Sequence, residues 1–175
     1  MKKIILLSVV AGIVMFFWGF ISWAVLPWHM TTANKFTDEA AVSQVLKDNA
    51  PQKGIYYLPF DEKKHGPDQV GAFASVLPDG TSMNMGKMMG ISLVTQIISA
   101  FLVLCLLALT CGLSYLGKVV FFAWTGLTVG FVSHAPYWNW FSFSTSYVSV
   151  MLLDILIAFT LAGLVVGKFA PTKNP

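Results

Sequence analysis

Asp154 is the residue whose type and position point most directly to chemistry. It is the only acidic residue inside the four long apolar runs of this sequence, and a charge near the centre of a bilayer costs at least about 2.5–3.5 kcal/mol. Such a carboxyl group must be paired, or neutral and hydrogen-bonded. Asp154 therefore marks either a proton or cation site, as in a small transporter or channel component, or a neutral group that fixes the register of packed helices.

Other polar side chains of the apolar runs lie at a depth similar to that of Asp154. They are Gln96 in the second run, Thr125 and Thr128 in the third, and Ser22 or Gly19 in the first. Ser92, Thr95 and Ser99 extend one face of the second run at helical spacing. We expect these groups to form a polar layer. A proton or cation pathway would need a second acid or base, and the apolar runs supply none. A neutral Asp154 that fixes helix register is therefore favoured over a role in transport.

His29 and His134 are the next candidates, because each lies at the end of an apolar run on the same predicted side of the membrane. Two histidines with a carboxylate such as Asp38 or Glu39 could bind zinc, copper or iron, and two histidines on separate helices could hold a haem. However, neither histidine belongs to a His-x-x-His or Glu-x-x-His pair. We predict no cofactor, and keep a metal or haem site at His29 and His134 as a further alternative.

No motif in the sequence predicts catalysis or nucleic-acid binding. It lacks a Gly-x-Ser-x-Gly nucleophile elbow, a phosphate-binding glycine loop and a Cys-x-x-Cys pair. Cys105 and Cys111 lie in one apolar run, where they behave as small hydrophobes. The 11 basic residues are all scattered lysines, so the net charge of +3 builds no basic surface for phosphates. We expect a protein that is not an enzyme and binds no nucleic acid.

Composition predicts an all-α integral membrane protein in contact with the lipid bilayer. Hydrophobic residues make up 56% of the 175 residues and charged residues 11%, which is too apolar for a water-soluble domain. About 20 apolar residues cross a bilayer, so four runs predict a bundle of four transmembrane helices: Ile4–Leu26, Met89–Leu113, Val119–Ser133 and Tyr147–Gly167. The third run is short, and an uncharged aromatic loop separates it from the fourth.

The first run also fits a secretory signal peptide. Lys2 and Lys3 precede it, and Ser22-Trp23-Ala24 would pass as a cleavage site. A membrane span is favoured, because the run is longer than the core of a signal peptide and contains several tryptophans.

The distribution of charge predicts an orientation. Five lysines fall in short segments without acidic residues on one side, which marks the cytoplasm: Lys2, Lys3, Lys118, Lys168 and Lys173. Seven of the eight acidic residues and all three histidines fall on the opposite side. We therefore expect a bacterial inner (plasma) membrane protein with both termini in the cytoplasm. An aromatic belt would mark the outer interface: Trp23, Trp28, Tyr137, Trp138, Trp140 and Tyr147.

A small extracytoplasmic α+β insert is predicted between the first and second helices. The chain then divides into residues 1–29, 30–87 and 88–175. Thr37 as N-cap before Asp38 and Glu39 predicts a short helix that stops before Pro51. Two strands and a turn follow at 54–60, 71–77 and 78–80. The insert is too small for a substantial core, so we expect it to pack on the outer ends of the helices, with His65 in a solvated loop.

Glycines at helical spacing predict close contacts between helices. They are Gly12 and Gly19 in the first run, Gly126 and Gly130 in the third, and Gly163 and Gly167 in the fourth. Gly163 lies about 180° around its helix from Asp154, so this helix would have two faces that avoid lipid.

These observations favour a protein that acts by interaction. We expect an accessory or assembly subunit, or a sensor of the outer face, whose partner is another membrane protein or a second copy of the chain. A transporter or channel component that uses Asp154 is the main alternative, and a metal or haem protein that uses His29 and His134 is the second.

Overall fold

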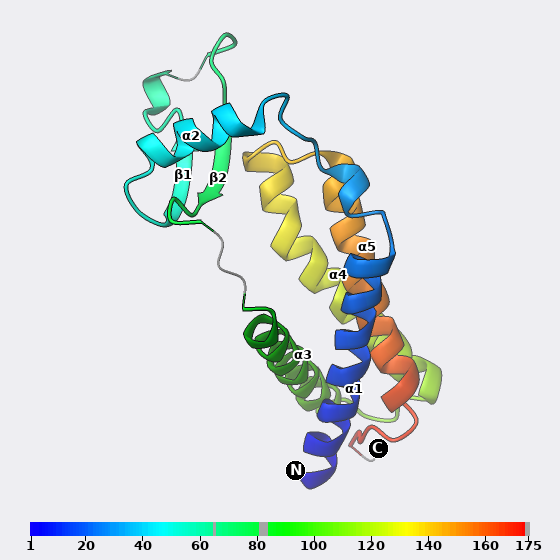
Figure 1. Ribbon diagram of the computed structural model, residues 1–175. Helices are drawn as coiled ribbons and strands as arrows, with labels where there is room; N and C mark the ends of the chain where they lie inside the picture. The colour runs from blue at the N-terminus through cyan, green and yellow to red at the C-terminus, as the bar shows by residue number, and fades with distance from the viewer. Residues whose placement is uncertain (65, 81–83, 174–175) are drawn as a thin grey trace. The chain divides into compact units, whose positions relative to one another are not determined.

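Four long apolar helices dominate the structure, a computed structural model that describes residues 1–64, 66–80 and 84–173 (Figure 1). They are α1 (Lys2–Phe20, continued by the π-helical turn η1, Ile21–Val25), α3 (Met85–Leu107), α4 (Tyr115–Trp140) and α5 (Thr145–Val166). Each is long and apolar enough to cross a membrane. The described chain thus confirms the prediction of a mostly helical protein with four such helices and a small sheet.

The helices α3 and α4 differ from their predicted bounds. α3 begins earlier than Met89, because the side chain of Asn84 caps it by accepting a hydrogen bond from the backbone N–H of Lys87 (3.0 Å). α4 extends beyond Ser133 to Trp140, through Pro136. The segment predicted as an aromatic loop is therefore largely helical, and only the short stretch before Thr145 connects α4 to α5.

Packing within the bundle is uneven. α1 packs against α3 and α5, and α4 packs against α5, whereas α3 and α4 touch only weakly. The core between these helices contains buried apolar side chains from all four: Ala11, Met15, Ala100, Leu104, Phe122, Phe159, Ala162 and Val166. The bundle is therefore tight on one side and open between α3 and α4.

Several predicted packing glycines lie at close approaches between helices. An added Cβ would lie 2.6 Å from Ile97 Cα at Gly12, 2.7 Å from Phe159 Cβ at Gly126, 3.1 Å from Leu152 Cδ2 at Gly130 and 2.8 Å from Phe122 Cβ at Gly163. An added Cβ at Gly167 would lie 2.5 Å from the carbonyl oxygen of Gly163 in its own helix and 3.5 Å from the Tyr115 ring, whereas an added Cβ at Gly19 would meet no described atom within 4 Å. Gly12 therefore allows α1 to approach α3, and the other three allow α4 to approach α5.

One end of the bundle collects the N-terminus, the α3–α4 connection and the last described residues (Figure 1). The backbone N–H of Lys173 donates to the carbonyl of Thr110 (2.8 Å), and Lys118 Nζ donates to the carbonyl of Ala170 (2.6 Å). These bonds join the C-terminal segment to the connection between α3 and α4.

The chain forms two compact units, and the smaller one is Asn34–Met83. It contains α2 (Glu39–Asn49) and an antiparallel pair of strands, β1 (Gly54–Leu58) and β2 (Ala72–Val76). The larger unit joins Met1–Ala33 to the chain from Asn84 onward. Single turns of 3-10 helix occur at Met30–Thr32 and Glu62–Lys64.

The local signals of the insert were mostly correct. The prediction of Thr37 as N-cap was wrong: Asp38 caps α2, because its carboxylate accepts a hydrogen bond from the backbone N–H of Ala41 (2.9 Å). The predicted turn forms after β2, where the N–H of Gly80 donates to the carbonyl of Leu77 (3.0 Å). His65, predicted to lie in a solvated loop, falls outside the described residues.

Candidate functional site

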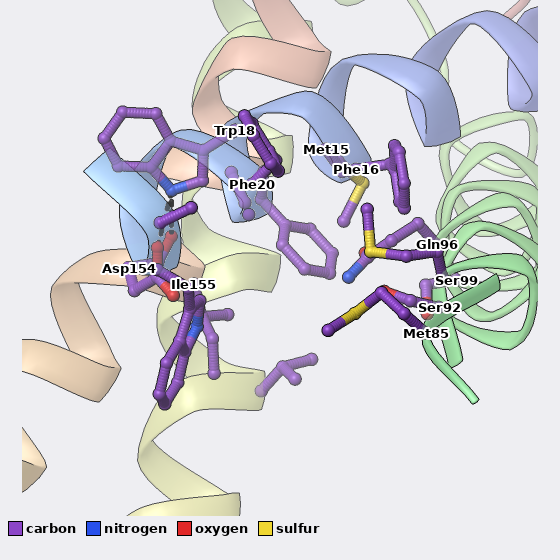
Figure 2. A pocket seen from close by; sticks show the side chains of 17 residues that line it. Met15, Phe16, Trp18, Phe20, Met85, Ser92, Gln96, Ser99, Asp154 and Ile155 are labelled. Atoms are coloured by element: carbon purple, nitrogen blue, oxygen red, sulfur yellow. Dashed lines mark hydrogen bonds between the residues drawn. The ribbon is translucent and has the colours of Figure 1, made fainter. Parts of the chain in front are cut away.

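Asp154 lies in the middle of α5 and is bound directly by α1. The indole Nε1–H of Trp18 donates to Asp154 Oδ1 (2.6 Å) and also to the backbone carbonyl of the same residue (3.1 Å). The Asp154 side chain is 14% exposed, and Figure 2 shows the two side chains facing each other. The short bond to a carboxylate ties α1 to α5 at this level.

A turn after α1 brings His29 back onto the same carboxylate. In η1 the helix widens, so that the N–H of Leu26 donates to the carbonyl of Ile21 (3.0 Å), a π-type bond. Leu26 is extended, and the chain then folds back. His29 Nε2 lies 3.5 Å from Asp154 Oδ2 and 2.9 Å from Ser22 Oγ, with the His29 side chain 3% exposed. The site therefore depends on the irregular end of the first span.

Two tryptophans hold the His29 turn in place. The His29 ring stacks on Trp23, with ring centroids 3.8 Å apart and planes at 8°. Trp28 Nε1 donates to Ser22 Oγ (3.0 Å), and the Trp28 ring meets Trp18 edge to face. These contacts restrict the position of the imidazole.

The hydrogen bonds of His29 favour one protonation state. Its Nδ1 is buried and has no hydrogen-bond partner among the described residues, whereas Nε2 lies near Ser22 Oγ and Asp154 Oδ2. A neutral ring with the proton on Nε2 can donate to Ser22 Oγ (2.9 Å) and leaves only a lone pair unsatisfied, while Asp154 Oδ2 lies 3.5 Å from the same nitrogen. The other tautomer and the imidazolium would each bury an N–H without an acceptor. The arrangement is therefore satisfied best by a neutral His29 beside the carboxylate of Asp154.

The geometry does not form a catalytic triad, although Ser22, His29 and Asp154 are adjacent. In a triad the two imidazole nitrogens have separate partners, one bonded to the acid and the other to the nucleophile. Here Ser22 Oγ and Asp154 Oδ2 both approach Nε2 of His29. The acid cannot orient the imidazole while the same nitrogen takes the proton of the serine. The three side chains are therefore not arranged as the nucleophile, base and acid of a triad.

Asp154 also lines a cleft of about 770 Å³ within the larger unit. The walls come from α1 with η1, α3 and α5, together with Val129 of α4. Figure 2 shows Asp154 and Gln96 on opposite sides of this cleft. The cleft lies beside α3, which packs only weakly against α4. The cleft gives Asp154 access to space that a small molecule can occupy.

The predicted polar layer is only partly assembled. Gln96, Ser92, Ser99 and Gly19 line the cleft with Asp154, although no hydrogen bond joins Gln96 to Asp154 in the described chain. The three threonines instead bond to their own helices: Thr95 to Ile91 O (2.9 Å), Thr125 to Phe121 O (2.8 Å) and Thr128 to Trp124 O (2.9 Å). They do not contribute to the site.

The hydrogen bonds of His134 lie within its own helix, α4. Its Nδ1 lies 2.9 Å from Ser133 Oγ and 3.1 Å from the carbonyl of Gly130, within α4. Among the described residues, no three His, Cys, Asp or Glu side chains gather as a metal ion would require. The geometry therefore gives no support to a metal or haem site at the two histidines.

Sequence reasoning did not identify Trp18 as a partner of Asp154 and did not place His29 beside this carboxyl group. A usable signal was present for Trp18: it precedes Ser22 by one helical turn, and a buried indole N–H needs an acceptor. Pro27, directly after Leu26, indicated a break that would let the next residues turn back. Comparison with known proteins adds nothing to these observations, because no family model, curated protein or solved structure matches the chain.

Proposed function

We propose that the chain is a multi-pass protein of a bacterial inner membrane that binds a small amphipathic molecule in the cleft, with Asp154 and His29 as its proton-binding pair. One observation carries the proposal: the only acidic residue of the four helices lines a cleft of about 770 Å³ instead of being enclosed by packed side chains. Ligand sites of this size, apolar with a few polar groups, are typical of small-molecule binding proteins.

The contacts of Asp154 support a role beyond helix register. Trp18 donates to one oxygen of the carboxylate, and His29 Nε2 lies 3.5 Å from the other, whereas a carboxylate has about four acceptor positions. Acceptor capacity therefore remains on Asp154, which lines the cleft. A group needed only to fix register would have no use for an open cavity beside it. The structural and the binding interpretations are thus compatible, because Trp18 positions the carboxylate that the ligand would meet.

A lipophilic carbodiimide tests whether Asp154 is protonatable and reachable from the cleft. Dicyclohexylcarbodiimide reacts with protonated carboxyl groups in apolar surroundings, and the adduct is located by mass spectrometry of peptides. We expect labelling at Asp154 and none in Asp154→Asn. A water-soluble carbodiimide should label the acidic residues of the insert instead.

Two glycine variants separate the cleft from the general membrane surface. Gly19 lines the cleft and has no atom within 4 Å of an added Cβ, so Gly19→Trp should fill the cleft and protect Asp154 from labelling. Gly90→Trp is the matched control, because Gly90 also has open space beside it but does not line the cleft. Equal labelling of Asp154 in both variants, or none in the parent protein, would contradict the proposal.

The insert supports interaction with a partner as a second candidate function. Its described residues include only Ala50 and Val76 as buried apolar side chains, while Phe60 is 87% exposed and Phe36 and Val70 are also exposed. Exposed apolar groups of this kind are typical of surfaces that contact another protein or a membrane. We infer a membrane-protein partner or a second copy of the chain. Mass measurement in mild detergent tests this: a strictly monomeric protein without a partner would count against it.

A further inference from the structure

We propose that the cleft takes a lipophilic organic cation, such as an ammonium or phosphonium ion with apolar substituents, which pairs with Asp154 in place of a proton. This inference rests on the proposed function and specifies the class of ligand. It is carried by the charge of the cleft, by the side chains around it and by the hydrogen bonds of His29.

The cleft carries a negative charge when Asp154 is deprotonated. Among the described residues, Asp154 is the only ionisable side chain that lines it, and no lysine belongs to its walls. His29 is satisfied best as a neutral ring and does not line the cleft. A carboxylate in an apolar medium interacts strongly with a cation because little water screens the pair. An anion of the same shape would be repelled.

The walls of the cleft suit a cation that cannot donate many hydrogen bonds. Aromatic and thioether side chains make up much of the lining, among them Phe16, Phe20, Trp23, Met15, Met85 and Met89. Aromatic faces attract cations, most strongly where water is absent, and methionines adapt to irregular apolar shapes. Gln96, across the cleft from Asp154 (Figure 2), adds a neutral carbonyl oxygen. The cleft therefore offers one charge and several soft apolar contacts.

Protons and the cation should compete. Protonation of Asp154 removes the charge that attracts the ligand. His29 is the titratable group that faces this carboxylate; α1 presents Trp18, α3 presents Gln96 and α4 presents Val129, all neutral. Protonation of His29 would place a positive charge beside the site and act in the same direction. We therefore expect cation affinity to fall as the pH is lowered.

Tetraphenylphosphonium is a suitable probe, with tetraphenylborate as an anion of the same shape and triphenylphosphine oxide as a neutral analogue. Binding to the purified full-length protein in detergent is measured by calorimetry and by the fluorescence of Trp18 and Trp23, which line the cleft. We expect saturable binding of the cation alone, weaker at acidic pH. Asp154→Asn, which keeps an acceptor for Trp18, should weaken it by about tenfold or more.

Two further variants make the outcomes decisive. Gly19→Trp should abolish binding without touching Asp154, and Gly90→Trp should leave it unchanged. If the neutral analogue binds as tightly as the cation and Asp154→Asn has no effect, the cation assignment is wrong while a binding cleft remains. If the anion binds better than the cation, the assignment is also wrong. If no probe binds and Asp154 resists the carbodiimide, both this inference and the proposed function fail.

Discussion

Trp18 and Asp154 form the contact on which the site depends. Their side-chain bond of 2.6 Å joins residues 136 positions apart in the sequence, and hydrogen bonds to charged groups contribute about 1.5–3 kcal/mol. His29 approaches the other carboxylate oxygen. The Trp18 indole N–H and the His29 imidazole nitrogen can each be removed by a single substitution that keeps an aromatic ring at the same position.

Replacing Trp18 by Phe removes the indole N–H and keeps an aromatic ring. Asp154 then loses its shortest hydrogen bond, so the variant should lose about 1.5–3 kcal/mol of stability, measured by thermal unfolding in detergent. Trp124→Phe is the matched control, because Trp124 is 64% exposed on α4. Equal losses in the two variants would show that the bond to Asp154 contributes nothing.

Replacing His29 by Phe keeps the stacking on Trp23 but removes the polar Nε2 atom. We expect a loss of about 1–3 kcal/mol of stability, because Ser22 loses its hydrogen bond to the imidazole and Asp154 loses the nitrogen 3.5 Å from its carboxyl group. His29→Gln retains a terminal N–H donor at a similar reach and should recover part of this loss. Thermal unfolding of both variants gives the comparison; if Gln is no better than Phe, the hydrogen bond is not the reason for the position of His29.

The sequence predicted part of this site for sound physical reasons. Asp154, Gln96 and Gly19 could be placed at one depth, because helical rise converts sequence position into depth, and all three line the cleft. Depth does not say which way a side chain points, so Thr125 and Thr128 were grouped with them, although their hydroxyls bond to their own helix. The approach of His29 depends on a turn whose direction no periodic pattern predicts.

Helices α4 and α5 pack through a reciprocal contact. Gly126 of α4 faces Phe159 of α5, and Gly163 of α5 faces Phe122 of α4. Each glycine leaves the space that the opposite ring requires, so the two backbones approach closely. Since α3 touches α4 only weakly, this contact is the main attachment of α4 to the bundle.

Replacing Gly126 by Ala tests the reciprocal contact. The new Cβ would lie 2.7 Å from Phe159 Cβ, so the helices must separate, and we expect a loss of about 1–3 kcal/mol. Gly90→Ala is the control, because its Cβ would meet no atom within 4 Å. Thermal unfolding should place Gly126→Ala below the parent and Gly90→Ala at or above it. The same result for both would mean that glycine serves no packing role here.

The length of α4 shows where hydropathy misleads. The apolar pattern stops at Ser133, yet the helix continues, because Ser133 Oγ donates to the carbonyl of Val129 (2.6 Å) and His134 Nδ1 lies 3.1 Å from that of Gly130. Polar side chains that bond within their own helix do not end it. Capping residues identify helix ends better than hydropathy does. At the start of α4, for example, Ser114 Oγ accepts a hydrogen bond from the N–H of Gly117 (3.1 Å).

At the level of the whole molecule, basic residues gather at one end of the bundle. The N-terminus with its two lysines, the start of α4 with Lys118 and the chain leading to Lys173 all lie there (Figure 1). Clusters of lysine next to apolar helices favour the cytoplasmic side. The same end holds Cys111, which is exposed in the α3–α4 connection.

Thiol labelling in intact cells tests the proposed orientation. With a membrane-impermeant maleimide, native Cys111 should react only after the cells are permeabilised. A cysteine introduced by Lys53→Cys, at an exposed position of the insert, should react in intact cells. The reverse pattern would place the insert in the cytoplasm and overturn the orientation inferred from the lysines.

The π-helical turn at Ile21–Val25 affects the position of His29 but has little effect on whether the first helix can cross a membrane. A π turn accommodates one residue more than an α-helix of the same length needs. Deleting Ala24 would let the turn return to α-helical hydrogen bonding and rotate the following residues by about 100° around the axis. The shortened helix would still cross a bilayer, but His29 would no longer approach Asp154.

We expect the Ala24 deletion to reach the membrane fraction normally and to unfold at a lower temperature than the parent; unchanged stability would show that the π turn is dispensable. Membrane insertion depends on the length of the helix, and this deletion barely changes the length. The site depends on the direction in which the residues after the turn leave the helix axis, and the deletion changes that direction. Loss of a single codon would thus leave a protein that is correctly delivered but has no site.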